Sequence, residues 1–210
     1  MVILTLEKSI GFLIAALLIT ATPGPDNLMV LSMGMSRGPR EGIAFGLGCA
    51  FGCLNHTLLA VVGITAVIAA SPTALTVLKL VGGLYLIWLG YRAWRRVGAV
   101  SSDMMPGDND SPAKLFLRGC VANAINPKVA LFFLSFLPQF VNANAGHLAA
   151  QIAWLGSIFT LQAAFIFGCI GFFSGAIGRW LNSKPVASII LDRIAGTVFI
   201  GLGLRIIYGR

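Results

Sequence analysis

Two ionisable side chains of opposite sign stand inside apolar stretches of this chain. Asp26 lies in an apolar run that begins near residue 10, and Lys128 lies in another that begins near residue 115. An ionisable group in the middle of a membrane span costs roughly 2.5 to 3.5 kcal/mol on insertion scales, so such residues are candidates for function. A carboxylate suits an ammonium group, and an ammonium suits a carboxylate. The two residues therefore predict either a static ion pair or a site that holds a zwitterion.

Both charges occur where the sequence interrupts a helix. The candidate residues for binding and coupling are Thr22, Pro23, Gly24, Pro25, Asp26 and Asn27 in the first run, and Asn126, Pro127 and Lys128 in the second. Proline removes a backbone donor and clashes with the preceding turn, so the helix breaks and its polar groups need new partners. A half-helix that restarts there presents free N–H groups and a positive dipole end, which suit a carboxylate. The alternative is a pair of kinks that serve helix packing alone.

Four polar residues elsewhere in the apolar runs are secondary candidates for the site: Asn55, His56, Asn123 and Gln162. A histidine titrates near neutral pH and is able to relay protons, although it also serves as a hydrogen-bonded packing residue. The cysteines stand away from the proline breaks in the sequence, at Cys49, Cys53, Cys120 and Cys169. Because no acids or histidines accompany them at metal-ligand spacing, we expect neither a metal nor a cofactor.

The composition is that of an integral membrane protein. Of the 210 residues, 57% are hydrophobic and only 10% are charged, and the mean hydropathy is +0.88. A soluble domain needs far more polar surface, so the composition excludes a soluble enzyme, a nucleic-acid-binding module and a disordered chain. The net charge of +8 is spread over short segments between apolar runs, which is typical of a protein with a basic cytoplasmic side and not of one with a nucleic-acid partner.

The elements that must position these residues are six apolar runs, each long enough to cross a bilayer core of about 30 Å. They cover residues 10–36, 43–70, 74–94, 115–141, 148–173 and 187–208. We interpret the first as a retained helix and not as a cleaved signal peptide. Lysine and arginine gather in the first, third and fifth connections, so these connections are predicted to be cytoplasmic and both termini to lie outside.

The runs form an internal repeat. Gly83, Gly90 and Arg92 of the third run match Gly196, Gly203 and Arg205 of the sixth, and aligning Pro23 with Pro127 also pairs Phe12 with Phe116. The predicted units are residues 1–96, a polar cytoplasmic linker at 97–114, and residues 115–210. Because each half has three spans, consecutive halves cross the membrane in opposite senses. The predicted fold is therefore an all-α integral membrane protein of two inverted three-helix repeats with helices 1 and 4 broken, as in many secondary transporters.

The chain resembles the LysE/RhtB family of amino-acid exporters. The likeness rests on the sequences TPGPDN at 22–27, NPKVALFF at 126–133, LPQFV at 137–141 and GYRAW at 90–94, and it covers nearly the whole chain. It implies an exporter of amino acids or close derivatives in a bacterial inner membrane, driven by proton antiport, and it allows a homodimer. It looks closer to the branch that exports homoserine, threonine and leucine than to the lysine branch.

We therefore expect a transporter, not an enzyme, whose partners are a small amino acid, the proton as coupling ion and the lipid bilayer. Two alternatives belong to other classes. A transporter of a metal or other cation requires several ligating side chains within the spans, and the sequence offers little beyond Asp26 and His56. A membrane thiol–disulfide electron carrier requires reactive cysteines beside the helix breaks, where this chain has Thr, Gly, Asn and Lys.

Overall fold

The structure is a computed structural model, and it describes residues 4–70, 72–95, 110–142 and 145–208. Within these ranges the regular elements are helices, which confirms the all-α prediction. In chain order they are α1 (Leu6–Ala21), α2 (Pro25–Arg37), α3 (Pro39–Ala70), α4 (Pro72–Arg95), α5 (Pro112–Ala124), α6 (Pro127–Ser135), the 3-10 turn η1 (Leu137–Gln139), α7 (Leu148–Phe172), α8 (Ser174–Ser183) and α9 (Pro185–Tyr208).

Proline sets the start of most of these helices. A proline is the first residue of α2, α3, α4, α5, α6 and α9. Its missing N–H would have no partner in the first turn of a helix, and its fixed φ already suits helical backbone. The same residue cannot continue a helix that arrives from the N-terminal side. The pattern of prolines therefore divides the apolar runs into the segments that the structure contains.

The two predicted helix breaks are confirmed. Between α1 and α2 the chain bends by 55°, and between α5 and the α6–η1 segment it bends by 52°. The first break comprises residues 22–24 and the second comprises residues 125–126. Each break separates a half-helix that ends from another that begins at a proline, which leaves polar backbone groups inside an otherwise apolar protein.

Length and composition support two to four membrane spans in the described residues. The helices that satisfy both criteria are α3, over Pro39–Ala66, and α7, and each bent pair adds a span if its two helices cross as one. The predicted third and sixth spans correspond to α4 and α9, which have 24 residues each. At about 1.5 Å per residue such a helix is long enough to cross the core. Six spans nevertheless remain a prediction, because α4 and α9 are not among the helices that meet the combined criteria.

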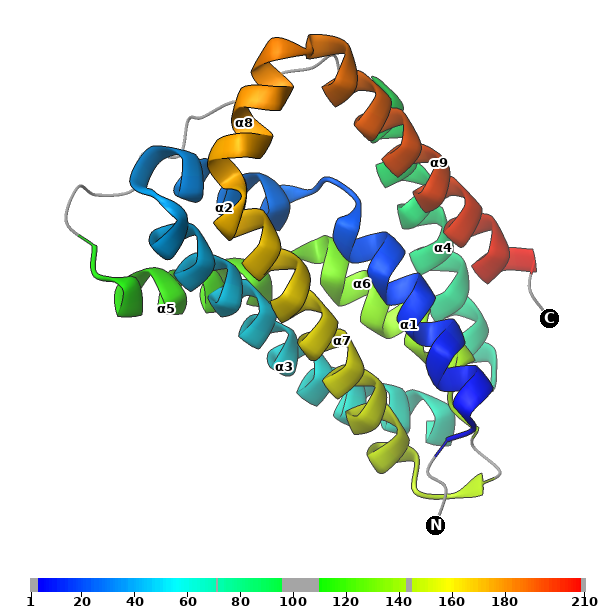
Figure 1. The fold of residues 1–210 in the computed structure, drawn as a ribbon. Coiled ribbons are helices and arrows are strands. Elements are labelled where there is room, and N and C mark those ends of the chain that lie inside the picture. Colours follow the sequence, from blue (N-terminus) through cyan, green and yellow to red (C-terminus); the bar gives the residue numbers. More distant parts are fainter. Residues whose placement is uncertain (1–3, 71, 96–109, 143–144, 209–210) are drawn as a thin grey trace.

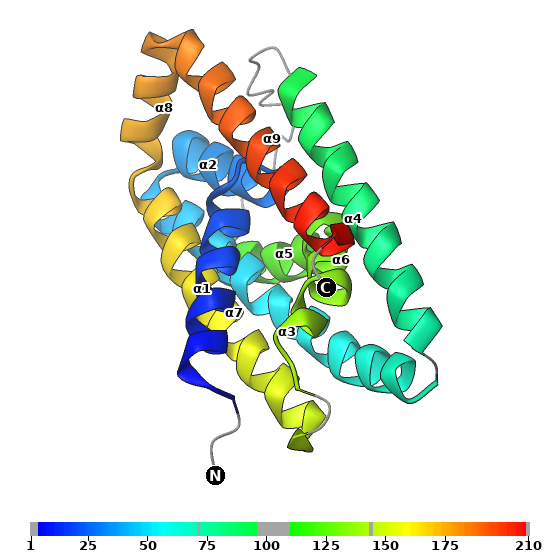
Figure 2. The ribbon, with the colours of Figure 1, turned by 90° about the vertical axis from the view of Figure 1, so that its right-hand side faces the viewer.

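The helices associate across the two halves of the chain. In Figure 1 and again in Figure 2, α7 runs along α3, and α9 runs along α4. A Cβ atom at Gly90 would lie 2.6 Å from the carbonyl oxygen of Gly196, and one at Gly203 would lie 2.6 Å from that of Gly83. Only glycine permits such close contact between helix backbones. Because low residue numbers on α4 face high numbers on α9, the two helices are antiparallel.

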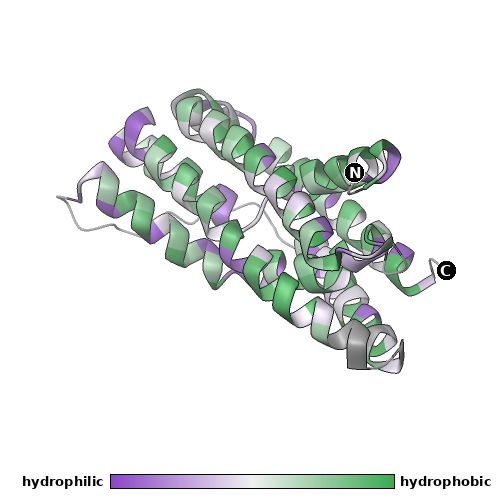
Figure 3. Cartoon of the chain, turned by 90° about the horizontal axis from the view of Figure 1, so that it is seen from below, coloured by the Kyte–Doolittle hydropathy of each residue, from purple (hydrophilic) through white to green (hydrophobic). Residues whose placement is uncertain are grey.

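The outer surface of the helices is much more apolar than that of a soluble protein. Large apolar side chains on the outer faces of α3 and α7 are strongly exposed, including Val62 at 72% and Phe165 at 73%, and Figure 3 shows apolar residues along most of the helices. The buried residues include charged and amide side chains such as Asp26, Asn123 and Lys128. An apolar exterior, with a few buried polar and charged side chains inside an apolar core, is the arrangement expected of a membrane transporter in a bilayer.

The predicted linker at 97–114 falls largely outside the described residues, which resume at Asp110. Its last three positions are not linker, because α5 already begins at Pro112. The side chain of Ser111 caps this helix by accepting a hydrogen bond from the backbone N–H of Lys114 at 3.4 Å. Serine before proline is a strong signal for a helix start, and it moves the boundary of the second half toward the N-terminus.

Candidate functional site at the two helix breaks

The first break is held by side chains next to it. Thr22 follows α1 and donates its hydroxyl to the carbonyl of Leu18 at 2.5 Å, and the Asn27 amide donates to the carbonyl of Thr20 at 2.8 Å. Gly24 is the N-cap residue of α2 and gives that helix no side-chain cap. Pro25 then occupies the first helical position and Asp26 the second. The first turn of α2 therefore begins in the protein interior without the cap that a serine, threonine or asparagine would supply.

The second break caps itself. Asn126 is the N-cap residue of α6, and its side-chain oxygen accepts a hydrogen bond from the backbone N–H of Lys128 at 3.0 Å. Its own backbone N–H donates to the carbonyl of Asn123 at 2.8 Å. Pro127 occupies the first helical position and Lys128 the second. An ammonium at the positive end of a helix is poorly placed with respect to the dipole, so Lys128 needs an acceptor from elsewhere.

The charged residue at each break is held by the other half of the chain. Asn123, just before the second break, donates its amide to Asp26 Oδ2 at 2.7 Å. Lys128 Nζ donates to the carbonyl oxygen of Thr22, in the first break, at 2.8 Å. Asp26 and Lys128 line the same cavity, and the hydrogen bond of each runs to the opposite break and not to the other charge. Each charge has its own partner across the interface.

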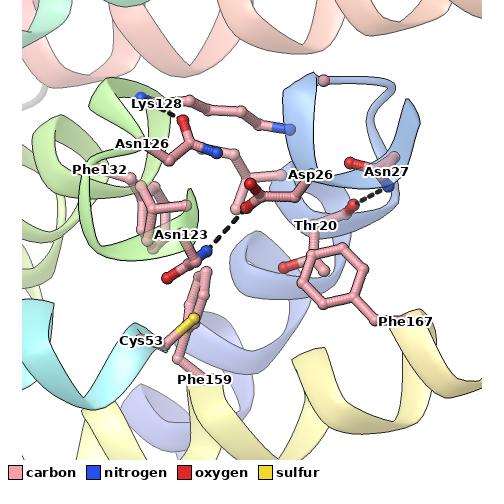
Figure 4. Close-up of a pocket in the computed structure, with 13 residues that line it drawn as sticks. Thr20, Asp26, Asn27, Cys53, Asn123, Asn126, Lys128, Phe132, Phe159 and Phe167 are labelled. Carbon is pink, nitrogen blue, oxygen red and sulfur yellow. Dashed lines mark hydrogen bonds between the residues drawn. The ribbon is translucent and has the colours of Figure 1, made fainter. Parts of the chain in front are cut away.

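These residues form the polar part of a small, otherwise apolar cavity, shown in Figure 4. Asp26 and Asn123 point toward each other, and Lys128 extends from α6 toward the α1–α2 break. The space open to the centre of a water molecule is about 10 Å³, which is near the minimum that holds one water. The cavity is therefore closed around roughly a single solvent molecule.

Two acceptor atoms at this cavity have no hydrogen-bond partner among the described residues. They are Asp26 Oδ1 and Asn123 Oδ1, which are both fully buried. An unpaired acceptor inside a protein costs about 1 to 3 kcal/mol, and more when it is charged. Two such atoms beside this small cavity create a local demand for hydrogen-bond donors, which an ammonium group or a proton on the carboxylate would meet.

Two of the secondary candidates support the walls of the cavity from the long helices. His56 on α3 lies 2.8 Å, through Nε2, from the backbone oxygen of Asn123. Gln162 on α7 donates to the Thr20 hydroxyl at 2.8 Å and to the carbonyl of Phe159 at 3.0 Å. The structure therefore brings His56, Asn123 and Gln162 to the site or next to it. Asn55 is exposed on the outer side of α3 and is not among the residues that line the cavity.

Several lining residues are ones that sequence reasoning missed. The cavity is also lined by Ile19, Thr20, Cys53, Val129, Phe132, Phe159 and Phe167. Helical spacing could have indicated three of them, because Cys53 precedes His56 by one turn, Phe159 precedes Gln162 by one turn, and Phe132 follows Lys128 by one turn. The expectation that the cysteines stand apart from the breaks is wrong for Cys53, since the packing of α3 against α5 places its thiol at the cavity.

A larger crevice lies on the opposite side of the breaks, toward α4 and α9. Its volume is about 580 Å³, and the three breakpoint prolines Pro23, Pro25 and Pro127 line it. Gly24, Asn126 and Lys128 line both this crevice and the closed cavity. The predicted site residues at the two breaks therefore form a partition between an open space and a closed one, with Thr22 supplying the carbonyl that holds Lys128 in place.

The chemistry that these residues offer is non-covalent binding. No group of three or more histidine, cysteine or acidic residues that could hold a metal ion occurs within the described part of the chain. The four cysteines are free thiols. The polar groups that line the cavity besides the Cys53 thiol are one carboxylate, one ammonium, three asparagine amides and the Thr20 hydroxyl. Together with a helix N-terminus, they are suited to binding a small molecule that carries both charges.

Comparison with known proteins gives a consistent result. Residues 17–210 match the family model described as LysE type translocator. The chain is 28% identical to the membrane protein YrhP of Bacillus subtilis, over 95% of this chain and 98% of the relative. It is 27% identical to a membrane protein of Vibrio cholerae, over 93% of this chain and 94% of the relative. It is 28% identical to a leucine efflux protein of Enterobacter sp., over 93% of this chain and 92% of the relative. No solved structure matches the chain.

Proposed function

This chain belongs to the LysE type translocator family, and from that premise we propose that it is a secondary active transporter, not an enzyme, that exports small apolar amino acids or close derivatives. A relative that covers nearly all of the chain is a leucine efflux protein. The observation that carries the proposal is the meeting of the two helix breaks around one small cavity, with an acid from one break and a base from the other.

The ammonium of the amino acid binds at Asp26 and Asn123. The side-chain atoms Asp26 Oδ1 and Asn123 Oδ1 are buried acceptors that lack partners among the described residues. An ammonium has three N–H donors and would satisfy both atoms at once. A charge-assisted hydrogen bond to Asp26 is roughly twice as strong as a neutral one, which makes this residue the principal contact.

The carboxylate binds at Lys128 and the first turn of α2. Lys128 Nζ is held by the carbonyl of Thr22, a neutral acceptor that a substrate carboxylate is able to displace. The N-terminus of α2 has no side-chain cap at Gly24, and a helix N-terminus with free N–H groups is a favourable position for an anion. Each end of the zwitterion therefore contacts both breaks: Asp26 and Asn123 hold the ammonium, and the first turn of α2 and Lys128 hold the carboxylate.

The rest of the cavity favours an apolar side chain. Its lining includes Ile19, Val129, Phe132, Phe159 and Phe167, and the Phe132 and Phe159 rings are in contact with centroids 5.5 Å apart. Burying an apolar side chain against such a surface gains about 25 cal/mol per Å². Because the closed space holds no more than about one water, binding has to be coupled to a parting of the two breaks.

Proton antiport requires a group that binds either a proton or the substrate. Asp26 serves both purposes, because its carboxylate accepts the substrate ammonium in one state and a proton from the outside in the other. The groups around it are Asn123, Lys128, Cys53 and, one contact further away, His56. One proton enters on Asp26 as one zwitterion leaves. Exchange of the two at a single carboxylate couples export to the proton gradient.

The proposed architecture is six spans in two inverted repeats. Gly83 faces Gly203 and Gly90 faces Gly196, and the sequence repeat relates Gly83 to Gly196 and Gly90 to Gly203. A two-fold axis in the membrane plane exchanges these two contacts, which supports the inverted repeat. We place the protein in the bacterial inner membrane with both termini outside, on the basis of its lysine and arginine distribution, and a homodimer is compatible with it.

The test is transport by the purified protein in proteoliposomes with an imposed pH gradient. Radiolabelled leucine, threonine and homoserine form the panel, and Asp26→Asn and Lys128→Ala are the variants. Truncating one partner of a buried charge contact costs about 2 to 5 kcal/mol, so we expect transport to fall at least roughly 30-fold in each. Glu7→Gln, which changes an exposed acid in α1, is the matched control.

Two outcomes would overturn the proposal. Wild-type rates in both Asp26→Asn and Lys128→Ala would remove the breaks from the transport mechanism. Movement of Na⁺ or a divalent cation, without movement of any amino acid in the panel, would instead favour a cation transporter. Transport that survives in a variant without cysteines would exclude a thiol–disulfide carrier.

A further inference from the structure

The crevice between the two breaks and the α4–α9 pair carries opposite charges at one end. Arg92 and Arg95 come from the C-terminal part of α4 and Asp192 from the N-terminal part of α9, and all three line the space. Because α4 and α9 are antiparallel, these three positions lie at the same end of the helix pair. That end leads into the connection that the distribution of basic residues predicts to be cytoplasmic.

The walls between these charges and the breaks are aromatic and apolar. Tyr85 and Leu89 of α4 and Phe199 of α9 line the crevice, and Phe199 is only 3% exposed. Lys128 Nζ lies 5.2 Å from the centroid of the Phe199 ring, within the range of a cation–π contact. The crevice therefore runs from a charged mouth, along an apolar wall, to the base at the second break.

The size of the crevice suits a small molecule, whereas the closed cavity does not. Its volume is about 580 Å³, and sites for small molecules commonly occupy about 300 to 1,000 Å³. The closed cavity has about 10 Å³ for the centre of a water molecule. In this conformation a free amino acid fits beside the breaks on the α4–α9 side, and it does not fit between them.

We propose that this crevice is a separate loading subsite for an apolar α-amino acid, in which Arg92 binds the carboxylate and Asp192 binds the ammonium before the substrate passes Lys128. The inference rests on the proposed function and adds a second binding step to it. The Arg92 guanidinium lies over the Trp88 ring with its carbon 5.0 Å from the centroid. Contact through the face of a guanidinium leaves its in-plane N–H donors for a carboxylate.

Lys128 connects the two sites. It lines both spaces, and its Nζ now donates to the carbonyl of Thr22. A carboxylate that moves inward from Arg92 meets Lys128 next, and an ion pair with it replaces the neutral contact with Thr22. The transfer of one carboxylate between two cations keeps the charge paired throughout its passage into the protein.

The chain offers a matched control for Arg92. In the sequence repeat Arg92 corresponds to Arg205, which is also exposed near the C-terminal end of its helix. Arg205 is not among the residues that line the crevice. Replacing each by glutamine makes the same chemical change at repeat-related positions, and only one of these positions belongs to the proposed subsite.

The first experiment measures the initial rate of leucine transport against leucine concentration on the predicted cytoplasmic side of proteoliposomes. We expect Arg92→Gln and Asp192→Asn each to raise KM roughly tenfold, the size of a single charge-assisted contact, with a much smaller change in Vmax. Arg205→Gln is expected to leave both constants at their wild-type values. Equal KM values in all four proteins would overturn the subsite while the proposed function stands. Failure of the wild-type protein to move any amino acid would overturn the function itself.

The second experiment measures binding directly and keeps the two sites apart. Asp26→Asn disables the central site, so equilibrium binding of labelled leucine to this purified variant reports the crevice. We expect binding to remain, and to be lost in Asp26→Asn combined with Arg92→Gln but not in Asp26→Asn combined with Arg205→Gln. Leucinamide, which lacks the carboxylate, should compete at least roughly tenfold less well than leucine. Absence of binding to a folded Asp26→Asn variant, or equal competition by leucinamide, would contradict the proposal.

Discussion

The two helix breaks occupy the same place in the two halves of the chain and differ in how they are completed. Gly24 and Asn126 are both N-cap residues, Pro25 and Pro127 both follow them, and Asp26 and Lys128 both take the second helical position. The sequence alignment paired Pro23 with Pro127, so the structure shifts the correspondence by two residues at the breaks. The first break is also one residue longer than the second. When the two breaks are aligned by their N-cap residues, Asp26 of the first half therefore corresponds to Lys128 of the second half.

The N-cap residues of α2 and α6 differ in whether their side chains satisfy the first turn of the helix. Asn126 satisfies an N–H of its own helix with its side chain, so the second break is complete without a ligand. Gly24 offers no such group, and the first turn of α2 keeps donors for an anion. We therefore propose that the first break supplies the backbone that binds the substrate carboxylate and that the second supplies a rigid platform for Lys128.

The second contact layer is more symmetric than the breaks themselves. His56 on α3 contacts the backbone of Asn123 before the second break, and Gln162 on α7 contacts Thr20 before the first. Each long helix therefore fixes the last turn before the break of the opposite half. A change in the crossing of α3 and α7 would move both breaks together, which is what an alternating-access mechanism requires.

The largest effect is expected from exchanging the two charges. Asp26→Lys combined with Lys128→Asp keeps one acid and one base, but it places an acid beside the Thr22 carbonyl and a base beside the uncapped turn of α2. We expect transport to stay at least roughly 30-fold below the wild type, as in the single variants, because the breaks are not interchangeable. The measurement is leucine transport in proteoliposomes. Thermal unfolding in detergent checks that the protein is folded, and recovery of activity would show that the breaks are equivalent.

A smaller effect is expected from capping the first break. Gly24→Ser introduces a hydroxyl that competes with the substrate carboxylate for the first-turn N–H groups, and its Cβ would lie 3.0 Å from Lys128 Nζ. We expect KM for leucine to rise roughly tenfold. The matched variant is Asn126→Ser, which keeps a capping residue at the second break and should change KM less than about twofold. Equal effects of the two serines would remove the distinction between the breaks.

The supporting contacts should affect stability more than binding. Gln162→Leu removes the amide that donates to the Thr20 hydroxyl, whereas the Phe159 carbonyl keeps the backbone hydrogen bond of its own helix. We expect a loss of about 1 kcal/mol in the free energy of unfolding. His56→Leu removes one contact and should cost about the same or less. Thermal unfolding in detergent compares the two variants. A loss of transport in Gln162→Leu without a loss of stability would instead make Gln162 a binding residue.

The smallest effect is expected at Asp110, far from the cavity. The Asp110 carboxylate forms ion pairs with Lys114, at 2.6 Å, and with Arg118. These two cations hold the pKa of Asp110 below the ordinary value of an aspartate, with a further contribution from Arg37 on α2. A lowered folded-state pKa means that the stabilisation is present above the ordinary carboxyl pKa and is lost as the pH falls through the folded value. Asp110→Asn should therefore lower the unfolding temperature slightly at pH 7 and not at pH 2. A shift of equal size at both values would exclude the ion pairs as its cause.

The sequence predicted the parts of the site that depend on local backbone chemistry. Proline cannot continue a helix, so the positions of the breaks follow from Pro23, Pro25 and Pro127 alone. The cost of an ionisable group within an apolar run is enough to select Asp26 and Lys128. The resemblance to the exporter family, which the family model confirms, added the class of protein.

Other parts of the site could not be predicted because they depend on contacts between distant helices. The partners of the two charges are Asn123 and the backbone carbonyl of Thr22, and a backbone oxygen has no signature in a sequence. Cys53 reaches the cavity, while Asn55, two residues later, is exposed. In a helix hydrophobic on every side, periodicity does not reveal which face meets a neighbour.

By itself the sequence determined an apolar helical protein with two proline breaks, an acid at one and a base at the other. Tertiary structure alone decided that the charges bind to opposite breaks and not to each other, and that the same three residues separate a closed cavity from an open crevice. The physical reason is that a proline or a charged residue affects mainly the helical turn in which it lies. The distance between the two breaks instead depends on how closely helices from the two halves of the chain pack against each other.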